Sequence, residues 1–490
     1  MTPTLTFNPS QYYDLYRPSR CELRLYLTHK DIKPSQPGAF ELVLARLGHK
    51  HEMNHLASFP DSLKLTGAPA ERTADALRSG TRVVYQGALK ASVRMQGTTL
   101  DVSGVPDFMI RTDGGYIIRD CKLARSAGEA DHPEIARQLQ TYGLLYERTT
   151  GTRPVRLEVL TGDGALDVLD YAGENAVIAS LHNIMNVISL PEEPYAPVGW
   201  TKCGGCGYRE YCMTRAGKNR DIALVYDLDQ NLAVHLRGMG VSTLDDLVTR
   251  FDEQGLSEVK RPWGAREQKV GKKAASILLQ ARAMLDNREI VIGKPALPVS
   301  MNYVMFDLEG LPPQLDELDK IYLWGMKVCG ERPGAFHCSL AEPGAGGDKA
   351  GWERFLTLAS DIFLDYGDIP FVHWHHYERT KINAYIERYG DRDGIAERVL
   401  SQLVDLLPIT RAAVVLPEPS YSLKVVEKHV GFQRSQDEYG GEWSIAKYIE
   451  AVETEDEGKR RSLMNEIVKY NEEDLQATWA VFEWLRRLNV

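Results

Sequence analysis

Alternating apolar and polar positions predict a β-hairpin in the first part of the chain. Two strand-like runs, 99–111 and 116–123, flank residues 112–115, whose Thr-Asp-Gly-Gly sequence is typical of a tight turn. A helix is expected to follow within 131–148, where the chain opens with Asp-His-Pro. The predicted hairpin therefore leads into a helix.

A second set of strands is predicted towards the other end of the sequence. Apolar runs at 301–313, 320–330 and 370–378 are separated by helical stretches, and the chain ends in a long amphipathic helix, which favours a mixed α/β sheet. Between the two sets, the sequence is helical and charged in pattern, and Lys-Pro-Ala-Leu-Pro at 294–298 is typical of a linker. We expect an α/β multidomain protein with three regions, 1–215, 216–295 and 296–490.

The composition is that of an ordinary folded chain. The 490 residues include 58 Lys and Arg and 68 Asp and Glu, a net charge of −10, which argues against a polybasic protein that wraps nucleic acid. A nuclease is not excluded, because such enzymes gather carboxylates around metal ions. The sequence shows neither a signal peptide nor an apolar run of about 18 residues, so we expect a cytoplasmic protein without a membrane partner.

Three of the seven cysteines lie close together in the sequence. Cys203, Cys206 and Cys212 have Cys-x2-Cys-x5-Cys spacing, and the glycines among them allow the backbone to bend tightly around a metal. The odd number of cysteines, spread thinly over a long chain, does not indicate a disulfide framework. The pattern therefore predicts a metal-binding group.

The predicted hairpin carries residues suited to metal-dependent hydrolysis. Asp107 lies near the end of the first run, and Asp120 and Lys122 are two apart on the second, so their side chains point to one face. Carboxylates suit Mg²⁺ or Mn²⁺, and the lysine can orient or deprotonate a water and offset phosphate charge. Gln138 and Tyr142, four apart on the next helix, share one side of it. By itself, an Asp-x-Lys pair is more often a solvated ion pair.

The order of these residues resembles the RecB-like nucleases of the PD-(D/E)xK superfamily that carry an iron–sulfur cluster. The resemblance covers residues 1 to about 215 and implies a restriction-endonuclease-like fold. Upstream, His51 and Glu52 on a predicted helix offer a further metal ligand. The resemblance implies metal ligands at His51, Asp107 and Asp120, a catalytic lysine at Lys122, a neighbouring motif at Gln138 and Tyr142, and [4Fe-4S] ligands at Cys21, Cys203, Cys206 and Cys212. Four thiolates also suit a structural zinc, although the uneven spacing favours the cluster.

A second acidic group is predicted in the third region. Asp307 and Glu309 are two apart on an apolar strand, and Tyr470 and Asp474 are four apart on the last helix. This pattern resembles the DEDD exonucleases of the RNase H-like fold over about residues 300–490. The resemblance implies that acidic groups hold two metal ions, that the tyrosine orients a water, and that ends are trimmed from 3′ to 5′.

The middle acid of this second group has two candidates. Glu378 is expected where a strand ends and a helix begins, whereas Asp405 lies in an apolar run that reads as helical. We therefore prefer Glu378. Because the family usually has an aspartate here, an RNase H-like fold without activity stays open as an alternative.

The region between the two groups contains a glycine-rich helix junction. Gly238 and Gly240 precede a helix start in a segment, 235–248, that resembles a helix-hairpin-helix element for sequence-independent nucleic-acid binding. A plain helical connector explains the pattern equally well.

The order of the three regions resembles a bacterial group of RecB-like nucleases that carry both modules, sometimes beside a helicase. The leading hypothesis is a metal-dependent DNA nuclease that acts on single-stranded or frayed ends in repair, recombination or defence. One alternative is a catalytically weak nucleic-acid adaptor that recruits a helicase. Another is an RNA-processing exonuclease, because nothing in the sequence reads a 2′-hydroxyl. The sequence does not indicate an oligomeric state.

Overall fold

The protein divides into two compact units in a computed structural model that describes residues 4–95, 97–264, 266–312, 319–342, 344–436 and 439–488. The first unit consists of residues 1–37, 41–196 and 202–211. The second consists of residues 38–40, 197–201 and 212–490. The helical middle region and the C-terminal α/β region thus fall within the same unit.

The first unit is built around a six-stranded sheet with the order β2-β3-β6-β7-β8-β9. Its strands are β2 (Leu63–Lys64), β3 (Val83–Tyr85), β6 (Phe108–Thr112), β7 (Gly115–Cys121), β8 (Arg156–Leu160) and β9 (Leu166–Leu169). The expected hairpin forms, because β6 pairs antiparallel with β7 from Phe108 opposite Arg119 to Thr112 opposite Gly115. β7 then pairs parallel with β8.

The expectation of one continuous strand before the hairpin is wrong. The run at 99–111 divides into β5 (Thr98–Gly104) and β6, and β5 belongs to a separate three-stranded sheet with β1 (Thr4–Phe7) and β4 (Leu89–Met95). Pro106 lies in the break, where its lack of an N–H prevents the strand ladder from continuing. Asp107 therefore directly precedes β6 instead of lying within a strand.

Helices of the first unit surround these two sheets. They are α1 (Tyr12–Tyr16), α2 (Glu22–His29), α3 (Ala39–Leu56, whose first two residues belong to the second unit), α4 (Ala70–Arg78), α5 (Pro133–Thr150) and α6 (Glu174–Ile188). The predicted helix is α5, which begins with Pro133 in its first turn and ends at Gly151, where a φ of 76° suits glycine. Leu139, Leu144 and Leu145 of α5 are fully buried, so this helix supplies much of the core.

The middle region is helical, as expected, but it also contains a β-hairpin. Its helices are α7 (Arg209–Lys218), α8 (Gln230–Gly238), α9 (Leu244–Arg250), α10 (Glu253–Glu258) and α11 (Lys273–Asp286). The hairpin, β10 (Lys260–Trp263) with β11 (Arg266–Lys269), lies between α10 and α11. Apart from the buried Arg261, the residues of its strands are exposed, and they lack the apolar alternation that marks a buried strand, which is why the sequence pattern did not predict them.

A five-stranded sheet with the order β15-β14-β13-β16-β17 forms the C-terminal part of the second unit. Its strands are β13 (Asn302–Gly310), β14 (Ile321–Gly330), β15 (Phe336–Leu340), β16 (Phe371–His373) and β17 (Leu403–Asp405). The expected mixed sheet is confirmed, since β13, β16 and β17 are parallel while β14 and β15 are antiparallel to their neighbours. The carboxyl ends of the three parallel strands therefore meet at one edge.

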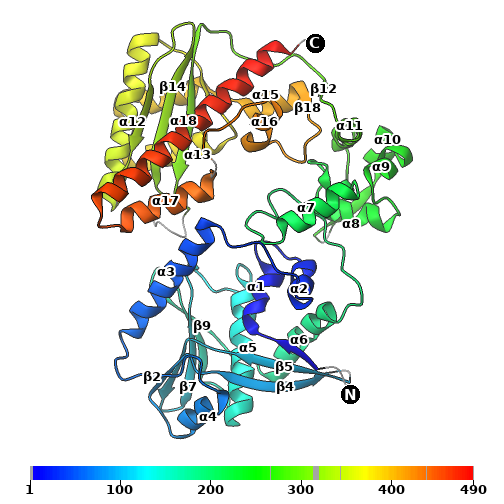
Figure 1. Ribbon diagram of the computed structural model, residues 1–490, viewed down its shortest axis with the longest axis vertical. Helices are drawn as coiled ribbons and strands as arrows, with labels where there is room; N and C mark the ends of the chain where they lie inside the picture. The colour runs from blue at the N-terminus through cyan, green and yellow to red at the C-terminus, as the bar shows by residue number, and fades with distance from the viewer. Residues whose placement is uncertain are drawn as a thin grey trace. The chain divides into compact units, whose positions relative to one another are not determined.

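Helices pack on both faces of this sheet (Figure 1). They are α12 (Gly344–Tyr366), α13 (Tyr377–Tyr389), α14 (Ile395–Gln402), α15 (Leu406–Ala413), α16 (Leu423–His429), α17 (Gly441–Glu453) and α18 (Glu457–Arg487); a short strand, β18 (Val414–Val415), pairs with β12 (Ile290–Val291). On β13, Val304 and Phe306 pack in the core with α12, whereas Tyr303 and Met305 pack in the core with α18. Because side chains alternate along a strand, Asp307 lies on the face that α18 covers.

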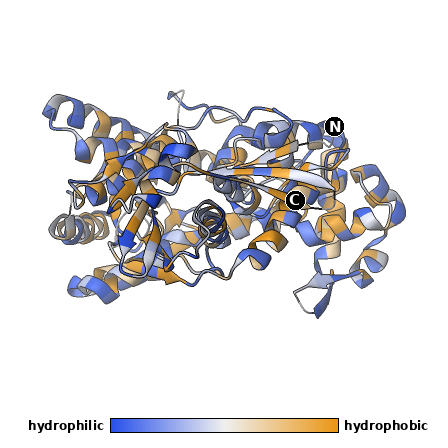
Figure 2. Cartoon of the chain, turned by 90° about the horizontal axis from the view of Figure 1, so that it is seen from below, coloured by the Kyte–Doolittle hydropathy of each residue, from blue (hydrophilic) through white to orange (hydrophobic). Residues whose placement is uncertain are grey.

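Apolar and polar segments are interleaved along the helices and strands (Figure 2). None of the described helices is sufficiently long and apolar to span a membrane.

Candidate active sites

Asp107, Asp120 and Lys122 come together at the end of β7 in the first unit. Lys122 Nζ lies 2.8 Å from Asp120 Oδ2, and the backbone N–H of Asp107 donates to Asp120 Oδ1 at 3.2 Å. Asp107 Oδ2 in turn accepts the N–H of Cys121 at 2.7 Å. These bonds hold the residue before β6 against the end of β7, so the hairpin brings together the carboxylates that the sequence pattern singled out.

The charges in this group are mutually dependent. Burial raises the pKa of Asp107 well above its ordinary value, and the negative charges of Asp120 and Glu52 raise it further. Burial opposes protonation of Lys122, but the two aspartates outweigh it and raise the lysine pKa. Lys122 is therefore an ammonium, which suits it to orienting a water and offsetting phosphate charge better than to removing a proton.

Two residues of α3 approach the same region. Glu52 Oε1 accepts hydrogen bonds from the Tyr85 hydroxyl at 2.8 Å and from Gln86 Nε2 at 2.7 Å, and its charge acts on Asp107. His51 Nε2 lies 3.2 Å from the carbonyl oxygen of Leu160, the residue paired with Cys121 across β7 and β8. The helix thus places Glu52 in the electrostatic environment of the aspartates and His51 beside the adjoining strand end.

Gln138 and Tyr142 are also part of this neighbourhood. Gln138 Nε2 donates to the Tyr142 hydroxyl at 2.7 Å, as their spacing of four residues on α5 allows. Burial and the charge of Asp120 raise the pKa of Tyr142 well above its ordinary value. A Cβ at Gly104 would lie 2.5 Å from the Tyr142 ring, so glycine is required there for the close approach. Both side chains are buried.

The four cysteines of the predicted cluster are half-buried and form no disulfide with one another. Cys21 is the N-cap residue of α2, and Cys212 lies in α7. Cys203 and Cys206 lie in a turn in which the Cys206 N–H donates to the Cys203 carbonyl at 3.3 Å. Four thiols are a donor set that fits either an iron–sulfur cluster or zinc, and the choice between them stays a prediction.

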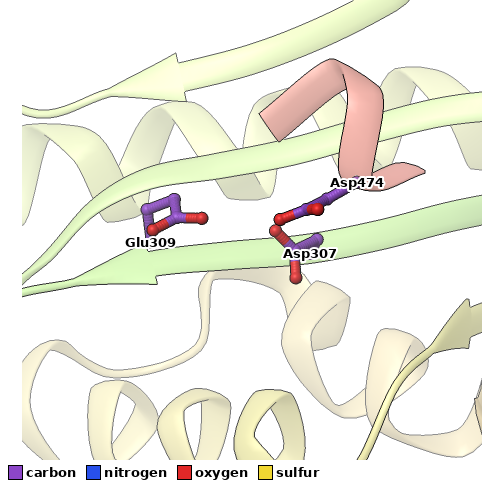
Figure 3. A group of neighbouring side chains, drawn as sticks. All are labelled: Asp307, Glu309 and Asp474. Carbon is purple, nitrogen blue, oxygen red and sulfur yellow. The ribbon is translucent and has the colours of Figure 1, made fainter. Parts of the chain in front are cut away.

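Three carboxylates meet in the second unit. Asp307, Glu309 and Asp474 each offer a ligand atom within 4.8 Å of the others. Figure 3 shows that Asp307 and Glu309 come from one strand and that Asp474 reaches them from a helix. The strand is β13 and the helix is α18, so the alternation of β13 and the packing of α18 on the same face create the group.

Asn471 of α18 positions the first of these carboxylates. Its Nδ2 donates to Asp307 Oδ2 at 2.7 Å. The helix can approach β14 because residue 325 is a glycine: a Cβ there would lie 1.7 Å from Asn471 Oδ1. Gly325 is paired with Asp307 across β13 and β14, so it is the strand neighbour of the residue that Asn471 holds.

Two cations contact Asp474. Lys424 Nζ lies 2.9 Å from Asp474 Oδ1 and 3.0 Å from the Tyr470 hydroxyl, while the guanidinium of Arg434 also donates to Asp474. Arg434 is fixed on its other side by two hydrogen bonds of 2.8 and 2.7 Å to Glu427. Tyr470 and Asp474 thus share one face of α18, as their spacing predicts.

The buried carboxylates resist ionisation. Burial raises the pKa of Glu309 to about 8; the charge of Asp474 adds to this shift, while Lys424 opposes it. Burial and the charges of Asp474, Glu309 and Glu378 raise the pKa of Asp307 well above its ordinary value. Acids packed this closely are expected to show such shifts, and a divalent ion bound among them would lower their pKa values.

The two candidates for the middle acid occupy different positions. Glu378 lies in the first turn of α13 and is buried, with Oε2 3.0 Å from His373 Nδ1, and its charge contributes to the raised pKa of Asp307. The expectation that Asp405 lies in a helical run is wrong, because it ends β17 and caps α15. Asp405 Oδ1 accepts the N–H groups of Leu407 at 3.0 Å and His375 at 2.9 Å, so it has a clear structural role.

Residues 304–486 match the sequence model of the RNase H superfamily. These residues form an RNase H-like domain. Members of this superfamily are typically nucleic-acid hydrolases, so the match indicates nuclease activity of a general kind. No curated protein matches the chain. Among solved structures, one titled "Crystal structure of SSO0001" is 16% identical, with a TM-score of 0.27, and the match covers 43% of this chain and 88% of that chain.

Sequence patterns missed three residues of the site in the RNase H-like domain. Asn471 is adjacent to the recognised Tyr470, but its contact with Asp307 depends on the glycine of another strand. Lys424 and Arg434 lie far from the motif acids in sequence, and single basic residues are too common to mark a site. The one sequence feature that points to Lys424 is the segment 420–432, which contains it and resembles the part of the DEDD exonucleases that follows the middle acid.

Proposed function

We propose that this chain is a metal-dependent nuclease that hydrolyses phosphodiester bonds of single-stranded or frayed DNA ends, in repair, recombination or defence. The observation that carries the proposal is the approach of Asp307, Glu309 and Asp474 within 4.8 Å on two elements of the RNase H-like domain. Glu309 and Asp474 are buried, and like charges held this close disfavour one another's ionisation. A shared cation offers the simplest compensation for such a group.

The donor set fits Mg²⁺ or Mn²⁺. All three ligand groups are carboxylates, which hard cations prefer, and burial, followed by the charge of Asp474, raises the pKa values of Asp307 and Glu309. Asp307, Glu309 and Asp474 would hold the metal, with Glu378 as a further ligand. When bound, the metal supplies activation of water and stabilisation of charge on the leaving oxygen.

The surrounding residues have separate tasks in this proposal. Tyr470, whose hydroxyl lies beside Lys424 Nζ, orients the attacking water by hydrogen bonding. Lys424 and Arg434 balance Asp474 and supply positive charge where a phosphate would sit. Asn471 fixes the rotamer of Asp307, so that this carboxylate needs no reordering during the reaction.

We propose a second nuclease site in the first unit. Asp107 and Asp120, with His51 from α3, would hold Mg²⁺ or Mn²⁺, and Lys122 would offset charge on the phosphate. The geometry that supports this is the contact of Lys122 with Asp120 and of Asp120 with the Asp107 backbone. Gln138 and Tyr142, which are hydrogen-bonded to each other on α5, would contact the substrate backbone beside these carboxylates. Cys21, Cys203, Cys206 and Cys212 would bind a structural [4Fe-4S] cluster.

The test is cleavage of end-labelled single-stranded DNA by anaerobically purified protein with Mg²⁺ or Mn²⁺. Wild type is compared with Lys122→Ala, Asp474→Ala and the double variant. We expect each single variant to lose one component of cleavage by about a hundredfold or more and the double variant to be inactive. Products that are shortened stepwise from the 3′ end should disappear in Asp474→Ala and persist in Lys122→Ala.

Two results would overturn this assignment. Undiminished cleavage by the double variant would place the chemistry elsewhere, and four inert proteins would support a nucleic-acid adaptor that acts with a helicase. RNA of the same sequence is tested in parallel. Cleavage of RNA in strong preference to DNA would favour RNA processing.

A further inference from the structure

The hairpin formed by β10 and β11 is a basic feature of an acidic chain. Residues 260–273 contain six Lys or Arg residues and one acid, Glu267, although the whole chain has a net charge of −10. The cations are Lys260, Arg261, Arg266, Lys269, Lys272 and Lys273, all but Arg261 exposed. Such a local reversal of charge creates a positive potential that attracts polyanions.

An exposed tryptophan lies among these cations. The Trp263 side chain is 52% exposed, an unusual exposure for a large aromatic residue that packs into no core. Its ring is held in place, because the guanidinium of Arg261 lies 4.5 Å from the ring centroid and Arg261 is itself only 5% exposed. Arg261 is anchored to Asp229, the N-cap of α8, by an ion pair of 2.5 Å.

The strand register places a second cation beside this ring. Trp263 is paired with Arg266 across the hairpin, and Arg261 with Gln268. Directly opposed side chains point to the same face, so Arg266 flanks Trp263 on the face where Arg261 packs. Arg261 links this face of the hairpin to α8 through its ion pair with Asp229, whereas Trp263 and Arg266 are exposed to solvent. A ring held in place with an exposed cation beside it is suited to stacking on a base next to a phosphate.

We propose that the β10–β11 hairpin binds single-stranded DNA, with Trp263 stacked on a base and Arg266 paired with a phosphate. This proposal rests on the proposed function, for which it supplies a substrate-holding element outside the acidic sites. Inside a duplex both faces of a base are covered by the neighbouring base pairs, so the ring selects unpaired DNA, whose bases can unstack. The cations alone would attract a duplex or a single strand alike.

The test is binding of a fluorescently labelled twenty-nucleotide single-stranded DNA, measured by anisotropy on the full chain in EDTA, where cleavage cannot contribute. Trp263→Ala should weaken binding roughly 5- to 150-fold, and Trp263→Phe, which keeps a ring, much less. Arg266→Ala should weaken binding and lower the slope of log affinity against log salt by about 1. Arg282→Ala, an exposed cation of α11 outside the hairpin, is the matched control and should bind as wild type does.

Hydrolysis of thymidine 5′-phosphate p-nitrophenyl ester separates this proposal from the proposed function. The hairpin variants should hydrolyse this small phosphodiester as wild type does, since neither Trp263 nor Arg266 belongs to either acidic site. The hairpin proposal would be overturned if Trp263→Ala bound DNA as tightly as wild type, or if Arg282→Ala weakened binding as much as the hairpin variants do. Tighter binding of duplex DNA or of RNA than of single-stranded DNA would also overturn it. Thermal unfolding of each variant checks that a loss of binding is not a loss of fold.

Discussion

At the scale of single residues, the RNase H-like site depends on one close approach between a helix and a strand. Asn471 reaches Asp307 only because Gly325 leaves room for it. This contact is a hydrogen bond to a side chain that is itself a candidate metal ligand. Partners of this kind set the orientation of a ligand and are costly to remove.

We predict that Gly325→Ala lowers nuclease activity about 10- to 100-fold with little change in the far-UV circular dichroism spectrum. The new methyl group would lie 1.7 Å from Asn471 Oδ1, so the amide must move away from Asp307. Activity is measured on the labelled DNA described above. Gly346→Ala is the control, because a Cβ at this helical glycine meets nothing within 4 Å. Equal activity of both variants with wild type would show that Asn471 does not position the site.

His55 of the first unit gives a second residue-scale prediction, concerning acid stability. Burial and the neighbouring charges of Arg119 and His51 lower its pKa to about 4. The neutral ring packs edge-on against Phe108, with Nε2 3.0 Å from Arg119 Nη1, which donates to it. Since the unfolded value is about 6.5, His55 adds stability that is complete above this pH and is lost as the pH falls towards 4.

We expect His55→Gln to make stability less dependent on pH in that window, because glutamine can accept from Arg119 but does not titrate. Urea unfolding of wild type and variant is compared at pH 7 and at pH 4.5. Wild type should lose more free energy of unfolding than the variant, by on the order of 1 kcal/mol after allowance for solvent screening. Parallel losses in the two proteins would contradict the assignment.

At the scale of elements, periodicity predicted the site where a regular element carries it. Alternation on β13 and the spacing of four on α18 indicate that Asp307, Tyr470 and Asp474 can gather, and the structure has them close together; their catalytic role stays a prediction. Prediction failed where a short element interrupts an apolar run, as at Asp405, or where a break divides one, as before Asp107. These features depend on which strand finds a partner, and a sequence pattern does not contain that information.

The short elements also separate the two candidates for the middle acid. We predict that Glu378→Gln lowers activity about a hundredfold or more while stability is kept. Asp405→Ala should instead retain activity and lose roughly 0.5–2 kcal/mol of stability, because it removes the cap of α15. DNA cleavage and urea unfolding of both variants provide the measurement. If Asp405→Ala were instead inactive but stable, Asp405 would be the middle acid of the site.

At the scale of the whole molecule, each unit gathers carboxylates around at least one cation, Lys122 in the first and Lys424 with Arg434 in the second. The grouping of the acids could be predicted because each motif places its residues two or four positions apart on one strand or helix. The cations of the second unit were not, because they reach the site through tertiary packing. A net charge of −10 therefore says little about how DNA would meet either site, since local cations decide that contact.

The cysteines allow a prediction for the intact chain that depends on neither acidic site. We expect anaerobically purified protein to contain about four iron and four sulfide per chain, as a [4Fe-4S] cluster requires. Cys203→Ser should lower both contents together and reduce the thermal midpoint, because cluster binding adds to the free energy of folding. Cys338→Ser, which alters a half-buried thiol of β15, is the control and should keep the full content. One zinc per chain without iron would instead assign these thiolates to a structural zinc site.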